Sequence, residues 1–170
     1  VYTGELLHYV PKTINGIFHP AIGYLILLMI GFYLLAMSLK LDPLIGIIGA
    51  VGYAFSSYFI IVLEAGHNSK IHAMAYLPGI LAGMIWAYRQ KKVWTGLAIF
   101  SLFTGLELTA RHPQMFYYFL FLAIPYGVWE LVQASKGKTL PSFVKTTVLL
   151  IAGALIAVAA NLPYLSNTYN

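Results

Sequence analysis

The chain has 170 residues, of which 60% are hydrophobic and 9% charged, with a formal net charge of +5 and no cysteine. Because soluble domains carry about 25% charged residues, this composition excludes an ordinary soluble domain and indicates an integral membrane protein. The lack of cysteine excludes disulfides, thiolate metal sites and a cysteine nucleophile. The basic residues lie mostly in short segments between apolar runs, which favours a role in membrane topology and no nucleic-acid partner.

Residues 1–20 are mixed and aromatic, and we expect them to form a membrane-surface segment. The chain begins at Val1 rather than at Met and ends at Asn170 in polar sequence. We therefore expect residues 21–170 to be the transmembrane region of a longer polytopic protein.

Six apolar segments follow: residues 21–39, 44–63, 73–88, 93–109, 113–129 and 146–162, with a polar loop over 130–145. At 1.5 Å per residue the first segment is long enough to cross a bilayer core of about 30 Å. Small residues in the second and sixth segments predict close helix packing. Pro78 in the third should leave the carbonyl of Met74 without its helical donor. The predicted fold is an all-α transmembrane bundle of about six spans with both ends on one side.

Basic residues are distributed unequally between the loops on the two predicted sides of the membrane. Seven lie on one side (Lys40, Arg89, Lys91, Lys92, Lys136, Lys138 and Lys145) and three on the other (Lys12, Lys70 and Arg111). Positively charged loops stay in the cytoplasm, so the second side is predicted to be external. All five histidines fall on that external side, which is therefore where we expect chemistry.

The first polar cluster, residues 64–72, interrupts almost pure hydrocarbon. In a helix, Glu64 would share a face with His67 and Asn68, although it could equally be a carboxylate at a helix end that reaches toward water. Ser69, with Asn68 beside it, is a predicted N-cap. Lys70 and His72 would then lie in the first turn of the next helix, where a cation opposes the helix dipole and calls for an anion.

The second polar cluster is Glu107, Arg111, His112 and Gln114. Pro113 suits the first turn of a helix, which would place Arg111 just outside a helix N-terminus, a favourable position for binding phosphate. The alternative is an ion pair between Glu107 and Arg111 at a spacing of four residues. The spacing of His67 and His72 fits no common zinc motif, and the chain shows no phosphate-binding loop or serine-hydrolase motif, so we expect no metal and no cofactor.

The chain resembles the YfhO-like bacterial membrane proteins. The resemblance rests on Phe55-Ser-Ser-Tyr-Phe, on Glu64-Ala-Gly-His-Asn-Ser-Lys70, on Arg111-His-Pro-Gln114, and on Ala160-Asn161 with the Leu165–Thr168 tail. It implies a similarity to C-type glycosyltransferases (GT-C) of the bacterial inner membrane, with transfer of a sugar from a polyprenyl-phosphate carrier to an envelope acceptor at the outer face. In GT-C enzymes a catalytic acid lies in the first large external loop, upstream of the residues seen here.

We therefore assign candidate roles within an inverting displacement. Glu64, His67 and His112 are the candidate catalytic residues, and the candidate substrate-binding residues are Asn68, Lys70, His72, Glu107, Arg111 and Gln114. The expected partners are membrane lipids, the lipid-linked sugar and other membrane subunits. The alternative is a non-catalytic structural or accessory subunit. A transporter is disfavoured because the ionisable groups lie at helix ends rather than at mid-span.

Overall fold

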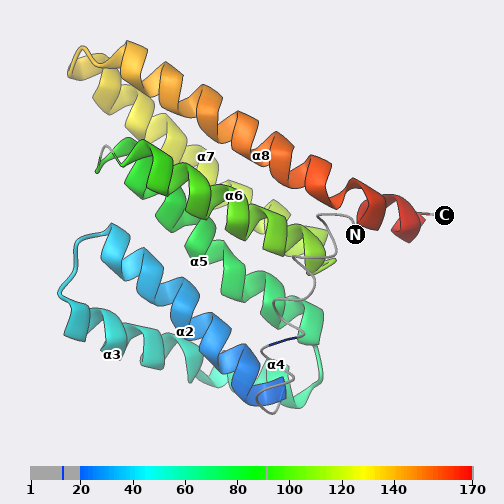
Figure 1. Ribbon diagram of the computed structural model, residues 1–170. Helices are drawn as coiled ribbons and strands as arrows, with labels where there is room; N and C mark the ends of the chain where they lie inside the picture. Colours follow the sequence, from blue (N-terminus) through cyan, green and yellow to red (C-terminus); the bar gives the residue numbers. More distant parts are fainter. Residues whose placement is uncertain (1–12, 14–19, 91, 170) are drawn as a thin grey trace.

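The computed structural model describes residues 13, 20–90 and 92–169, with side chains as far as Leu162. These residues form seven α-helices and no strand, which confirms the expected all-helical class (Figure 1). The helices are α2 (Pro20–Ser38), α3 (Pro43–Ala54), α4 (Ser57–Glu64), α5 (Asn68–Tyr88), α6 (Val93–Thr109), α7 (Pro113–Lys136) and α8 (Leu140–Tyr169). The surface segment predicted over residues 1–20 lies almost entirely outside the described residues.

Four of these helices, α2, α5, α7 and α8, are long and apolar enough to cross a membrane. The pair α3 and α4 qualifies only when taken together, and α6 is a shorter apolar helix. The turns alternate between two ends of the bundle (Figure 1). We call the end with the α4–α5 and α6–α7 turns the histidine end, because His67 and His112 lie there, and the opposite end the lysine end.

The second predicted span is not one straight helix, because it bends by 42° between α3 and α4. Phe55 caps α3, and Ser56 has extended backbone angles (φ −61°, ψ 146°) before α4 begins at Ser57. Serine hydroxyls compete for backbone hydrogen bonds and so favour helix ends over helix interiors. The two consecutive serines therefore fit the break.

The polar loop predicted over residues 130–145 is wrong. α7 continues to Lys136, and α8 begins at Leu140, so only residues 137–139 form the turn. Pro125 does not end α7, which is consistent with the tolerance of proline in membrane helices. Glu130 is drawn into the bundle because its Oε1 atom accepts a 2.5 Å hydrogen bond from Arg89 Nε, joining α7 to the end of α5. That bond also raises the pKa of the Arg89 guanidinium above its ordinary value.

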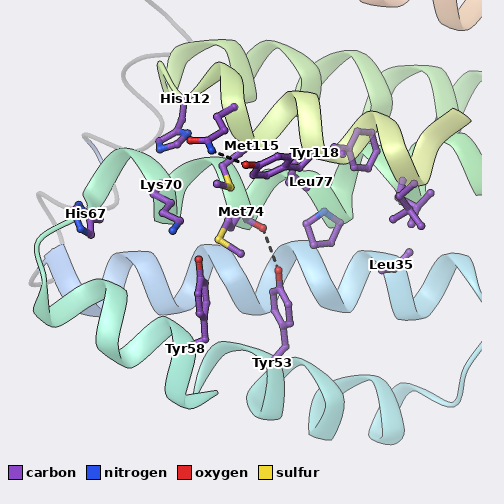
Figure 2. Close-up of a pocket in the computed structure, with 15 residues that line it drawn as sticks. Leu35, Tyr53, Tyr58, His67, Lys70, Met74, Leu77, His112, Met115 and Tyr118 are labelled. Carbon is purple, nitrogen blue, oxygen red and sulfur yellow. Dashed lines mark hydrogen bonds between the residues drawn. The ribbon is translucent and has the colours of Figure 1, made fainter.

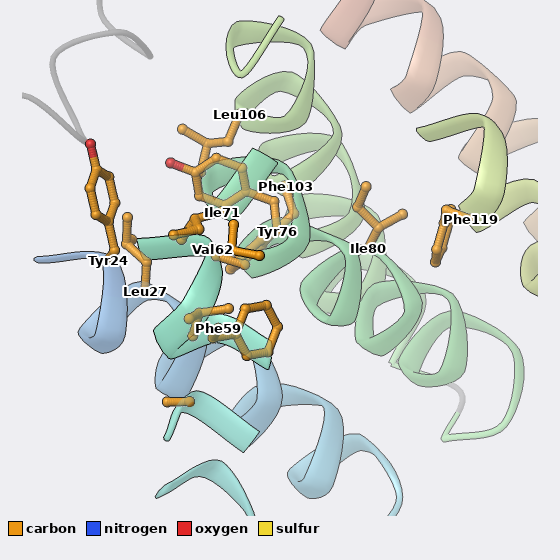
Figure 3. Packing of buried hydrophobic residues seen from close by; sticks show 13 residues of the cluster. Tyr24, Leu27, Phe59, Val62, Ile71, Tyr76, Ile80, Phe103, Leu106 and Phe119 are labelled. Atoms are coloured by element: carbon orange, nitrogen blue, oxygen red, sulfur yellow. The ribbon is translucent and has the colours of Figure 1, made fainter. Parts of the chain in front are cut away.

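α5 is the central helix, and it packs most extensively against α6 and α2. Its contact with α6 is close because Gly83 faces Gly96 and the backbone of Phe100, where a Cβ atom on Gly83 would lie 2.6 Å from the Phe100 nitrogen. Buried side chains of α2, α4, α5 and α6 fill the space between these helices, with Tyr76 and Phe103 in ring contact (Figure 3).

The small-residue faces predicted from the sequence do pack closely. On α3, Gly46 and Gly49 lie against Tyr33 and Phe32 of α2. On α8, Gly153 lies against Ser101 of α6, and one turn further along Ala157 is buried. Close packing through small residues is the expected way for membrane helices to associate.

Candidate functional site

A cavity of about 770 Å³ lies between α7 on one side and α3 and α4 on the other, with α5 along its length (Figure 2). One part of its wall is apolar: Leu35, Met74, Leu77, Pro78, Leu81, Met115, Phe119 and Leu122. The other part is polar: Tyr53, Tyr58, His67, Lys70, His112, Gln114 and Tyr118. We call this cavity the amphipathic pocket. Figure 2 shows His67, Lys70 and His112 at one end of it and Leu35 at the other.

The α5 wall follows directly from helical periodicity. Lys70, Met74, Leu77 and Leu81 recur at spacings of four, three and four residues and so share one face of the helix. From Lys70 to Leu81 this face extends about 16 Å at 1.5 Å per residue. The pocket is therefore elongated along the helix axis, with its cationic group at the histidine end.

The turn before α5 places the first of these polar groups. Gly66 has a positive φ of 73°, which glycine adopts without strain, and it lets the chain reverse between α4 and α5. His67 follows as the N-cap residue, but it makes no side-chain capping hydrogen bond. The predicted N-cap, Ser69, is therefore wrong, because α5 already begins at Asn68.

Lys70 and Tyr58 face each other across the pocket. The Lys70 Nζ atom lies 5.4 Å from the centroid of the Tyr58 ring, within the range of a cation–π interaction. This contact holds the ammonium group in the cavity without neutralising its charge. Lys70 remains half-buried and available to an anion.

The α7 wall begins at the turn between α6 and α7. His112 is the N-cap residue of α7 and is followed by Pro113, as the sequence predicts for a helix start. The buried Nδ1 atom of His112 has no hydrogen-bond partner among the described residues. One turn into α7, Gln114 Nε2 donates a 2.7 Å hydrogen bond to the Tyr118 hydroxyl. His112 can therefore offer its Nδ1 ring nitrogen to a ligand.

The carbonyl that Pro78 leaves free has a partner in this pocket. The Tyr53 hydroxyl donates a 3.2 Å hydrogen bond to the Met74 carbonyl oxygen (Figure 2). The Met74 carbonyl oxygen therefore accepts a hydrogen bond from a side chain of another helix, in place of the helical donor that Pro78 lacks. It ties the end of α3 to the middle of α5 and positions Tyr53 on the cavity wall.

The structure brings together in this pocket four of the residues singled out from the sequence, namely His67, Lys70, His112 and Gln114. Glu64 and Asn68 are exposed near the α4–α5 turn and do not line it. Glu64 ends α4, so the shared helical face with His67 and Asn68 does not form. His72 packs edge-to-face on the Tyr24 ring, with centroids 4.8 Å apart.

Glu107 and Arg111 lie outside the pocket as well and do not pair with each other. α6 ends at Thr109, and Arg111 has a positive φ of 53°, so the helical register that would join them is lost. Glu107 is 3% exposed and faces the bundle interior, whereas Arg111 is exposed. The alternative considered for these two residues, an ion pair, is therefore wrong.

The sequence interpretation named none of the tyrosines or apolar residues that line the pocket as site residues. Tyr53 and Tyr58 flank the break between α3 and α4, and the two serines of that break were the available signal. Together the lining residues offer one cation, Lys70, and hydrogen-bonding groups at one end of the pocket and hydrocarbon along the rest. Such a surface fits an amphipathic molecule with an anionic head.

Comparisons of the chain with protein-family profiles, with curated proteins and with solved structures found no match.

Proposed function

We propose that this chain is a membrane glycosyltransferase-like protein that binds a polyprenyl-phosphate-linked sugar in the amphipathic pocket. The observation that supports the proposal most directly is the division of the pocket lining, with Lys70, His67 and His112 at one end and apolar side chains along α5 and α7. A phosphate matches the cationic end, and a polyprenyl chain matches the remainder. The resemblance to YfhO-like and GT-C proteins supports the same class of donor.

In the proposed reaction an acceptor hydroxyl attacks the anomeric carbon of the sugar. His112 or His67 accepts the hydroxyl proton as a general base. The bond between the anomeric carbon and the carrier phosphate oxygen breaks, and its electron pair leaves with the phosphate. Lys70 stabilises the developing negative charge on that leaving group.

The proposed orientation places the histidine end outside the cytoplasm of a bacterial cell, in the inner membrane. The proposed orientation needs six membrane crossings, with α3 and α4 counted as one. Successive turns then lie on opposite sides of the membrane. The described basic residues Lys40, Arg89, Lys92, Lys136 and Lys138 lie at or near the turns of the lysine end, in agreement with the positive-inside rule.

A second candidate function is a non-catalytic subunit that binds the lipid without transferring the sugar. The observation that favours it is the absence of any Asp or Glu side chain from the described lining of the pocket. Only the two histidines are then available as bases. Other membrane subunits are the partners expected for this alternative.

Farnesyl phosphate and farnesol, which differ only in the phosphate, test the proposal in detergent. Farnesyl phosphate should raise the thermal unfolding midpoint of the wild type, and farnesol should not. Lys70→Gln should weaken farnesyl phosphate binding by about tenfold or more, because hydrogen bonds to charged groups contribute about 1.5–3 kcal/mol. Lys136→Gln, at the other end of the bundle, is the matched control. Equal effects of the two ligands would refute the phosphate site.

A transfer assay separates the two candidate functions. Membranes containing the chain would be supplied with a polyprenyl-phosphate sugar, and sugar release from the carrier would be measured. If the chain is an enzyme, replacing both His67 and His112 with Gln should abolish transfer while most of the binding remains. Binding without transfer in the wild type would identify the subunit instead.

A further inference from the structure

A second group of polar atoms lies in the bundle interior, away from the amphipathic pocket. Glu107 and Thr104 lie one turn apart on α6, and their exposed fractions are 3% each. Tyr76 on α5 is 1% exposed, and Asn161 on α8 is fully buried. Four side chains from three helices therefore carry oxygen atoms into one apolar interior.

The side chains of this group lie against the same segment of α6. Glu107 is close enough to the Tyr76 hydroxyl to interact with it electrostatically. Figure 3 shows Tyr76 reaching toward α6 beside Leu106. Asn161 Nδ2 donates hydrogen bonds to the carbonyl oxygens of Gly105 (3.3 Å) and Ala157 (2.8 Å), which fixes Asn161 at this level of α6.

The oxygen atoms of these side chains have no hydrogen-bond partner among the described residues. Both carboxylate oxygens of Glu107, the hydroxyls of Tyr76 and Thr104, and Oδ1 of Asn161 are all buried and unpaired. Buried polar groups are normally paired, because an unpaired one costs about 1–3 kcal/mol and an unpaired charge considerably more. An ionised Glu107 in this interior therefore needs a positive partner.

We propose that Glu107, Thr104 and Tyr76 form a binding site for a monovalent alkali cation such as Na⁺ or K⁺. All the available ligand atoms are oxygens, which hard cations prefer. The single carboxylate matches a single positive charge, and the site joins α5 to α6.

The test measures thermal unfolding of the chain in detergent at constant ionic strength, with NaCl or KCl replaced stepwise by choline chloride. The wild type should be stabilised by Na⁺ or K⁺ in a saturable manner. Glu107→Gln should lose this dependence, whereas Glu64→Gln, which removes an exposed carboxylate, should keep it. Equal unfolding midpoints in NaCl, KCl and choline chloride would overturn the proposal and leave Glu107 as a protonated acid.

Two further variants keep the test decisive if Glu107→Gln does not fold. Thr104→Val and Tyr76→Phe each remove one candidate ligand oxygen and retain the carboxylate and most of the side-chain volume. Each should raise the cation concentration needed for half-maximal stabilisation several-fold. Wild-type cation dependence in both variants would show that the ion binds elsewhere and would overturn the site.

Discussion

The Tyr53 hydroxyl lies 3.2 Å from the Met74 carbonyl oxygen and donates a hydrogen bond to it, across the junction of α3 with α5. In an uninterrupted helix this oxygen would accept from the amide of residue 78, which is a proline and has no N–H. The helix defect at Pro78 and the tertiary contact of Tyr53 therefore depend on each other.

The first prediction concerns this dependence. Tyr53→Phe should lower the free energy of unfolding by about 1 kcal/mol, because the Met74 carbonyl loses its donor. In a Pro78→Ala background the same change should cost less, since the amide of residue 78 can then donate to that carbonyl. Thermal unfolding of the two single variants and the double variant in detergent measures the coupling. Strictly additive effects would contradict it.

The second prediction concerns the contact between α5 and α6. Gly83→Ala should destabilise the protein by at least the roughly 1–3 kcal/mol typical of overpacking, because the new Cβ atom would meet backbone atoms of α6. Gly127→Ala on α7 is the matched control, since a Cβ atom there has no neighbour within 4 Å. The control should be neutral or stabilising by up to about 1 kcal/mol, as alanine favours helix more than glycine does. Similar unfolding midpoints for the two variants would show that the close approach is absent.

The third prediction concerns the turn between α7 and α8. Lys138 is exposed and has a positive φ of 54°, a backbone conformation that costs a residue with a Cβ atom about 1–2 kcal/mol. Lys138→Gly should relieve this strain, although glycine also increases the entropy of the unfolded chain. We expect the free energy of unfolding to rise by about 0.5–1 kcal/mol. Lys136→Gly, which removes the same charge from the last residue of helix α7, should instead destabilise. Chemical or thermal unfolding of both variants distinguishes conformation from charge, and equal effects would favour charge.

The fourth prediction concerns orientation in the membrane. The chain has no cysteine, so single introduced cysteines can be labelled without background. In intact cells an impermeant thiol reagent should label Ser69→Cys at the histidine end. Leu41→Cys and Thr139→Cys at the lysine end should react only after the membrane is permeabilised. All three positions are exposed in the structure, so a reversed pattern would mean that the proposed orientation is inverted.

The sequence predicts the helices well where hydropathy changes abruptly. α6 spans Val93–Thr109 and α2 spans Pro20–Ser38, close to the predicted segments. Prediction failed in α7, where the polar residues from Glu130 onward suggested a loop, although Glu130 is buried and pairs with the partly exposed Arg89. The sequence alone does not show that a charged residue pairs with a residue more than forty positions away, so Glu130 was interpreted as solvent-exposed.

The candidate site could be predicted only in part, for a related reason. Alternation of helical spans is enough to place His67 and His112 at the same end, and the structure adds that both line one pocket. It is not enough to predict how each helix is rotated about its own axis. Rotation decides that Lys70 faces the cavity while His72, two residues later, packs against Tyr24.

The bend between α3 and α4 also determines the dielectric environment of the pocket. α4 has eight residues, so the break lies about 12 Å from the histidine end of the bundle at 1.5 Å per residue. The Tyr53 and Tyr58 side chains on either side of the break line the pocket, and Tyr58 lies beside Lys70. Two unit charges 4 Å apart interact with about 1 kcal/mol in water and about 4 kcal/mol at an effective dielectric constant of 20. A charged group held beside Lys70 in the pocket would therefore interact with it more strongly than the same group would in bulk water.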